Sequence, residues 1–240
     1  YAYAPVWHIG LVYEDHTWPL GQPVSAHLFR TWPARWLTLW TFSLTPTVPA
    51  MHFVQVGLHV TVAGLLVAVA RQITTLPIAW GAGLIFLLHP LHTEAAAYLT
   101  ARTDLLMTVW ILVALWCALR LTTRWDLGVF VTAAALWMAG WSKELGVIGL
   151  PLVVWSLWCY RPATRRVLLI GGPLVTFTLL AWRGPQFLTW VQLPMMWGGA
   201  TVGVVSYLWW QWCAVGQLLG LVVWPVPLSI DHDPVGASAF

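Results

Sequence analysis

Long apolar stretches separated by short polar ones organise most of this 240-residue chain. Because about 20 apolar residues are needed to cross the hydrocarbon core of a bilayer, such stretches predict membrane-spanning helices. The candidate spans are residues 49–70, 76–88, 105–119, 127–141, 145–160 and 167–182. Several are short, so tilt, local thinning of the bilayer or burial against neighbouring helices must make up the length. The pattern predicts an all-α, polytopic membrane bundle of about six spans.

Two other segments, residues 33–44 and 202–224, mix aromatic and polar side chains in a way that suits the headgroup layer. We expect an interfacial helix in the first and an interfacial or re-entrant helical hairpin in the second. A seventh span through 202–224 is the alternative, but it would carry Asp231 and Asp233 to the cytoplasmic side.

The predicted organisation is a single transmembrane domain over residues 1–240. It has an outer loop at 1–48, spans over 49–182 and a second outer loop at 183–240. The chain opens without Met, and its first 45 residues lack a run long enough to span. We therefore expect a fragment of a longer protein, with a preceding span and a C-terminal half missing.

Composition excludes a soluble globular protein. Hydrophobic residues make up 60% of the chain and charged residues 8%, too few to form a water-facing shell. The 20 Trp residues favour many interfacial or lipid-facing anchors. Three scattered Cys residues indicate neither a disulfide framework nor a zinc site. The excess of basic over acidic residues is explained by loop arginines that set membrane orientation. No nucleic-acid partner is needed to explain it.

Charged residues divide between the two sides if the spans alternate. One side receives six of the eleven basic residues and one of the eight acids, and by the positive-inside rule it is cytoplasmic. Its basic residues are Arg71, Arg120, Arg124, Arg161, Arg165 and Arg166. The other seven acids then face outward, which for a bacterial inner membrane is the periplasm.

Four polar clusters stand at the outward ends of apolar segments, at residues 13–16, 89–104, 142–144 and 231–234. Ionisable groups at membrane depth are costly and usually mark a function, so their convergence predicts a shared polar pocket. Simpler interpretations remain open: solvated loop acids, an ion pair within the Lys143–Glu144 turn, and an exposed acidic turn at 231–233. Pro90 interrupts a regular helical pair of His89 and His92, and we predict no metal site.

Together the clusters resemble a known family. Residues 89–96 (HPLHTEAA) and 101–106 (ARTDLL) are similar to the HPxHTEAV…GRxDLL signature of the tetratricopeptide-repeat protein O-mannosyltransferases and their bacterial relatives. Residues 12–16 (VYEDH), 142–146 (SKELG) and 224–233 (WPVPLSIDHD) resemble three further motifs in the same order. The family usually has two aspartates in its first loop, where this chain has Glu14 and Asp15, and its members continue through more spans.

The resemblance implies a GT-C-type glycosyltransferase that takes a sugar from a polyprenyl-phosphate carrier on the non-cytoplasmic face. It implies Asp15 as the catalytic base with Glu14 beside it, and Arg102 and Lys143 as phosphate contacts. The pocket would be shaped by His92, Glu94, Asp104, Glu144, Asp231 and His232. No cofactor is firmly implied beyond the lipid-linked sugar donor.

A second hypothesis is a non-catalytic membrane subunit derived from such a transferase. The missing segments and the Trp-rich periphery would suit a scaffold in a larger complex, for example respiratory or photosynthetic. Its partners would be membrane lipids and other integral membrane subunits. Gene length on both sides of this segment would separate the two hypotheses.

Overall fold

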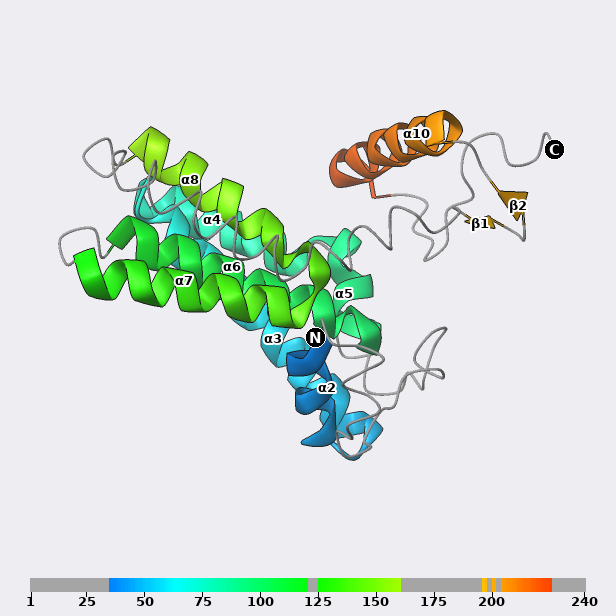
Figure 1. Cartoon of the computed structure of the whole chain (residues 1–240), viewed down its shortest axis with the longest axis horizontal. Coiled ribbons are helices and arrows are strands. Elements are labelled where there is room, and N and C mark those ends of the chain that lie inside the picture. Colours follow the sequence, from blue (N-terminus) through cyan, green and yellow to red (C-terminus); the bar gives the residue numbers. More distant parts are fainter. Residues whose placement is uncertain (1–34, 121–124, 161–195, 198–199, 202–203, 226–240) are drawn as a thin grey trace. The chain divides into compact units, whose positions relative to one another are not determined.

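The structure is a computed structural model that describes residues 35–120, 125–160, 196–197, 200–201 and 204–225 (Figure 1). The chain divides into two units, residues 1–179 and 180–240, and each is described by itself.

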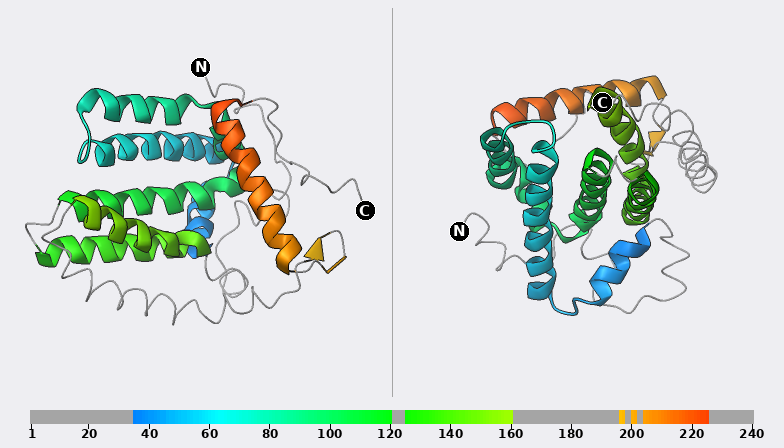
Figure 2. Two further views of the ribbon diagram at one scale, coloured as in Figure 1. Left: turned by 90° about the horizontal axis from the view of Figure 1, so that it is seen from above. Right: turned by 90° about the vertical axis from the view of Figure 1, so that its left-hand side faces the viewer.

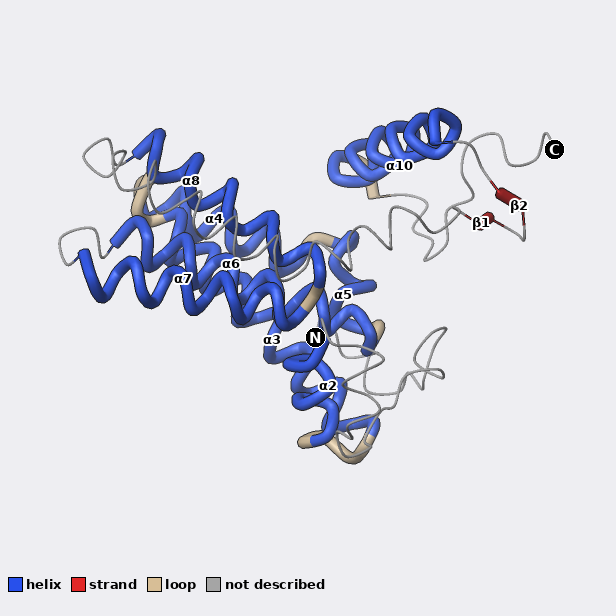
Figure 3. The backbone as a smooth tube through the Cα atoms, in the orientation of Figure 1, coloured by secondary structure: helices blue, strands red, loops and turns tan. Residues whose placement is uncertain are grey.

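The described part of the first unit is entirely helical (Figure 3). Its elements are α2 (Trp36–Ser43), α3 (Val48–Ala70), α4 (Leu76–Leu88), η4 (Pro90–His92), α5 (Thr93–Ala97), η5 (Leu99–Ala101), α6 (Arg102–Arg120), α7 (Trp125–Ser142), η6 (Glu144–Ile148) and α8 (Gly149–Tyr160).

Local sequence signals explain several of these boundaries. Helix α3 begins after Thr47, whose side-chain oxygen accepts a hydrogen bond from the Ala50 amide, and it carries a proline in its first turn. Helix α4 ends at His89, which is extended because it precedes Pro90. Both helices therefore start and stop near the limits that the apolar pattern predicts.

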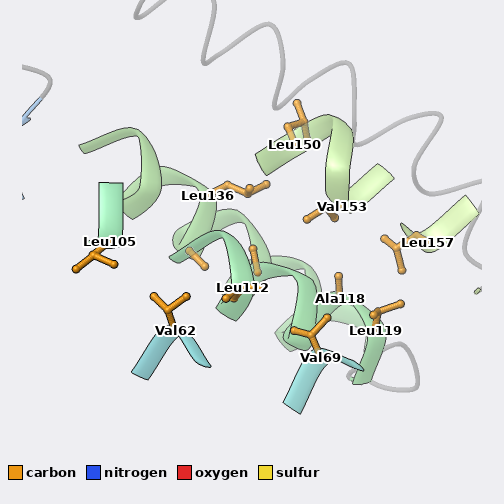
Figure 4. Close-up of a cluster of buried hydrophobic side chains, with 12 residues drawn as sticks. Val62, Val69, Leu105, Leu112, Ala118, Leu119, Leu136, Leu150, Val153 and Leu157 are labelled. Carbon is orange, nitrogen blue, oxygen red and sulfur yellow. The ribbon is translucent and has the colours of Figure 1, made fainter. Parts of the chain in front are cut away.

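The five longer helices of this unit run side by side as an up-and-down bundle (Figure 2). Helix α6 packs against α3, α7 and α8. The core between them is aliphatic, and Figure 4 shows its side chains pointing toward one another. They include Val62 and Val69 of α3, Leu112 and Leu119 of α6, Leu136 of α7, and Leu150, Val153 and Leu157 of α8.

Two described helices are long and apolar enough to cross a membrane: α3 and the η5–α6 segment, Leu99–Arg120. A third span exists if α4 and its continuation, Pro90–Ala97, count as one span with a 54° bend. The remaining apolar helices, α7, η6–α8 and the helix of the second unit, are shorter. By length and composition, the described residues thus show two or three of the six expected spans, and the expected span at 167–182 lies outside them.

In the second unit, β1 (Met196–Trp197) pairs antiparallel with β2 (Ala200–Thr201), and α10 spans Val204–Val223. The expected helical hairpin over 202–224 is wrong, because residues 204–223 form one continuous helix. This stretch contains no proline, and the glycines at 216 and 220 do not interrupt it. Its placement at the interface or across the bilayer stays a prediction.

The turn between α7 and α8 depends on Gly146, which leads to a test of the fold. A Cβ at Gly146 would overlap the backbone of Ala139 and Gly140 in α7. We expect Gly146→Ala to destabilise the protein by about 3 kcal/mol, because backbone atoms cannot move aside locally. Thermal unfolding in one detergent measures the effect.

The matched control is Gly64→Ala in α3, where a Cβ would meet nothing within 4 Å. This change should be neutral or stabilise the helix by up to about 1 kcal/mol, because alanine is the better helix former. Equal melting temperatures for the two variants would contradict the close approach of η6 and α7.

Candidate functional site

Charged side chains from three segments of the first unit gather at one end of its bundle. This end contains the start of α6, the η6 turn after α7 and the short helix α2, which lies across the ends of α6 and α7 (Figure 2). Arg71 follows the C-terminal end of α3 and Arg120 ends α6, so both belong to the opposite end. Asp104 and Glu144 thus lie at the end opposite Arg71 and Arg120.

Arg102 lies at the first position of α6 and is completely buried. Its Nη2 donates to the backbone oxygen of Met51 at 2.7 Å, and its Nη1 and Nε donate to Thr45 Oγ1 at 3.3 Å and Gln55 Oε1 at 3.4 Å. The guanidinium carbon also sits 4.0 Å from the centroid of the Phe42 ring, a cation–π geometry. Arg102 therefore ties α6 to α3 and to the segment between α2 and α3.

Gln55 extends this network to the HPLHTEAA segment. Its side chain is buried, and its Nε2 donates to the backbone oxygens of Ala95 at 2.7 Å and Tyr98 at 3.0 Å. These bonds hold α5 and the chain that follows it against α3. Sequence reasoning missed Gln55, although a glutamine inside a long apolar run was a signal for a specific partner.

Lys143 and Asp104 form an ion pair with 2.6 Å between Nζ and Oδ1. The pair joins the ARTDLL segment to the SKELG segment, 39 residues further along the chain. The Lys143 side chain is 22% exposed and that of Asp104 46% exposed, so the pair can be approached from outside the protein.

Glu144 pairs with Arg35 at 3.3 Å, across 109 residues of sequence. The two charges of the Lys143–Glu144 turn thus each bind a distant segment, and this differs from the ion pair within the turn that was one simple interpretation. Sequence reasoning assigned Arg35 only to an interfacial helix. Its partner could not be identified because nothing local in the sequence connects it to Glu144.

His92 lies in a cluster of rings beyond the end of α4. Its ring centroid is 4.2 Å from that of Phe86, 5.8 Å from that of His59 and 6.0 Å from that of His89. Three imidazoles and one phenyl ring thus meet where α3 approaches the segment that follows α4.

Glu94 follows in the first turn of α5 and is exposed. Within the described residues, no group of three or more His, Cys, Asp or Glu side chains could hold a metal ion. Of the predicted site residues, the structure brings Asp104, Lys143 and Glu144 together. It places His92 and Glu94 on the neighbouring η4–α5 segment. Four predicted site residues, Glu14, Asp15, Asp231 and His232, lie outside the described residues.

Fold and site together define a helical protein with two or three apolar helices compatible with membrane crossing and a charged site at one end. No protein-family model matches the chain, and no solved structure matches it. A curated relative does: a Caenorhabditis elegans protein named protein O-mannosyl-transferase F38B6.6. It is 39% identical to this chain over 77 residues, 32% of this chain and 11% of the relative. The match thus covers about a tenth of the relative's length. Its similarity indicates a distant relationship to a glycosyltransferase.

The Arg102 network leads to a stability test. Arg102→Leu removes a buried charge and leaves the Met51 carbonyl and the polar atoms of Thr45 and Gln55 without that donor. We expect a loss of about 3 kcal/mol, because buried polar groups deprived of a charged partner pay their full desolvation penalty. Arg71→Leu, at an exposed position, should change stability by less than about 0.5 kcal/mol.

Both variants are compared with the unchanged chain by thermal unfolding in the same detergent. Arg102→Lys should fall between them, since one ammonium cannot reach three acceptors spread around a guanidinium. Unfolding of Arg102→Leu at the temperature of the unchanged protein would mean that the network contributes nothing.

Proposed function

We propose that this chain carries the sugar-transfer site of a GT-C-like membrane glycosyltransferase. The enzyme would move a sugar from a polyprenyl-phosphate donor to a hydroxyl of a protein or glycan on the non-cytoplasmic face. The observation that supports this most is the Lys143–Asp104 pair, because it joins two of the four motif segments. The local similarity to a protein named for O-mannosyl transfer points to the same class.

The proposed reaction needs a base and a cation. Asp15 would accept the proton of the acceptor hydroxyl as its oxygen attacks the anomeric carbon of the sugar. The bond from that carbon to the phosphate oxygen breaks, and the polyprenyl phosphate leaves with the electron pair. Lys143 would bind this phosphate, because its ammonium has two further N–H donors besides the one directed at Asp104.

Asp104 then has a positioning role. Its carboxylate fixes the Lys143 ammonium on one side, so that a phosphate approaches from the exposed side. Arg102, which touches protein groups on several sides, would position the start of α6 on which Asp104 lies. In this proposal, contact with the donor phosphate belongs to Lys143 more than to Arg102.

The sugar would be recognised by groups on the η4–α5 segment. Exposed Glu94 can accept hydrogen bonds from sugar hydroxyls, and the His92 ring nitrogens can take part in further hydrogen bonds. Gln55 would hold this segment in register with Asp104 through its bonds to Ala95 and Tyr98. Arg71 and Arg120 support the proposed orientation, in which the opposite end of the bundle faces the cytoplasm.

A non-catalytic scaffold is the second candidate, and the exposed aromatic side chains favour it. Trp155 of α8 is 69% exposed, and Trp209 and Trp212 of α10 are 67% and 71% exposed. Such side chains can face lipid or a partner subunit equally well. Retention in a larger complex through mild detergent, without sugar transfer, would favour the scaffold over the enzyme.

The test uses the full gene product in membranes, with polyprenyl-phosphate mannose as donor and a Ser/Thr-rich peptide as acceptor. We expect Asp15→Asn to lower kcat by about a hundredfold or more, because the amide cannot accept the proton. Lys143→Gln should lower kcat by at least about tenfold, because it removes charge stabilisation from the leaving phosphate.

Arg71→Gln is the matched control, since it removes a cation from the opposite end and should leave transfer unchanged. Transfer by Asp15→Asn at the full rate would eliminate the proposed base. Absence of transfer by the unchanged protein with every lipid-linked sugar tried would favour the scaffold.

A further inference from the structure

Helix α2 has two different faces. Leu37, Leu39 and Phe42 are buried against the bundle, and Thr38 Oγ1 donates to the backbone oxygen of Ser142 at 3.1 Å. The opposite face exposes three large apolar side chains at helical spacing of four residues: Trp36 at 36%, Trp40 at 47% and Leu44 at 61%. Such a stripe is costly in water, since burying apolar surface is worth about 25 cal/mol per Å².

The position of α2 indicates what covers this stripe. Four residues separate α2 from α3, one of the two helices long enough to cross the membrane, so α2 lies close to the level where that span begins. It crosses the ends of α6 and α7 and does not run alongside them (Figure 2). Exposed Phe53 and Val60 on α3 place a lipid-facing surface within two to four turns of α2.

We propose that α2 lies in the headgroup layer of the bilayer, with Trp36, Trp40 and Leu44 inserted among the lipids. Tryptophan is the residue that favours this layer most, because its ring is apolar and its N–H finds polar partners there. This inference rests on the membrane crossing of α3 and not on the chemistry of sugar transfer.

Helix α2 also connects the headgroup layer to the ion pairs of the site, through Arg35 and the part of the Trp36 ring that is not exposed. Arg35 precedes α2 and binds Glu144, and the rings of Trp36 and Trp141 meet edge to face at 6.0 Å. Helix α2 therefore fixes the depth of the η6 turn in the membrane. Where the proposed function also holds, this depth lets Lys143 meet a lipid phosphate that stays in its own layer.

Depth can be measured with spin labels in the full chain, reconstituted into phosphatidylcholine vesicles. Cys117, Cys159 and Cys213 are first replaced by Ala, and single cysteines then carry a nitroxide at Trp40 or Trp36. Labels at exposed Val60 and at exposed Thr74, in the loop between α3 and α4, serve as references for the lipid interior and for a polar loop. Thermal unfolding establishes that each labelled protein is folded.

We expect the ratio of oxygen to nickel-chelate accessibility at positions 36 and 40 to lie clearly above that of Thr74 and toward that of Val60. A ratio equal to that of Thr74 would mean that the stripe faces water. Exclusion of both reagents would mean that another protein segment covers it. Either result overturns the proposal, and neither depends on a substrate.

The depth-setting role has its own readout. A label at exposed Leu145, next to Glu144, should lose oxygen accessibility and gain nickel-chelate accessibility when Trp36 and Trp40 are both replaced by Ser. Two exposed tryptophans on the helix of the second unit, Trp209 and Trp212, provide the matched control pair. An unchanged ratio at Leu145 in the Trp36/Trp40 variant would show that α2 does not set the depth of the turn.

Discussion

A buried guanidinium in an apolar helix bundle must be surrounded by acceptors, and this requirement organises the charged end of the first unit. An uncompensated charge in such surroundings would cost several kcal/mol or more. Arg102 meets the requirement by bonding to Met51, Thr45 and Gln55 and by lying against the ring of Phe42. These groups belong to α2, α3 and the segment between them, so satisfying one charge fixes where three segments meet.

The ion pairs depend on that arrangement. Asp104 lies two residues after Arg102 on α6 and can meet Lys143 only if α6 and the turn after α7 are aligned. Gln55, which accepts from Arg102, in turn holds the backbone of the HPLHTEAA segment. A polar network of this kind is stabilising when every member is paired, and it specifies one arrangement of otherwise interchangeable apolar helices.

The sequence predicted the helices well, because helix faces that contact lipid and helix faces in the core are both apolar. Both therefore contribute to the same apolar runs. Helix α4 has the predicted bounds, 76–88, because Pro90 forces an extended residue before it. The placement of the polar clusters on one side of the membrane also predicted a shared pocket for residues 89–104 and 142–144, and the contact between Asp104 and Lys143 joins those two segments. Asp15 and Asp231 stay predictions, because they lie outside the described residues.

Tertiary detail was less accessible from the sequence. The partner of Glu144 is 109 residues away, and the burial of Arg102 depends on where α2 and α3 pack around it. The hairpin expected over 202–224 was wrong because aromatic and polar character was given more weight than the absence of a helix breaker. Of the six expected spans, two or three are long and apolar enough within the described residues, and the one at 167–182 lies outside them.

We propose that the outer-loop motif at residues 12–16 lies close to the SKELG segment at one end of the first unit, and cross-linking measures this proximity. In a full chain whose native cysteines are replaced, Asp15→Cys with Glu144→Cys would be treated with a short bis-maleimide. Arg35→Cys with Glu144→Cys serves as the positive control, and Asp15→Cys with Arg71→Cys as the negative one. We expect efficient cross-linking of 15 with 144, comparable to the positive control. Cross-linking of 15 with 71 instead, or of neither pair, would contradict it.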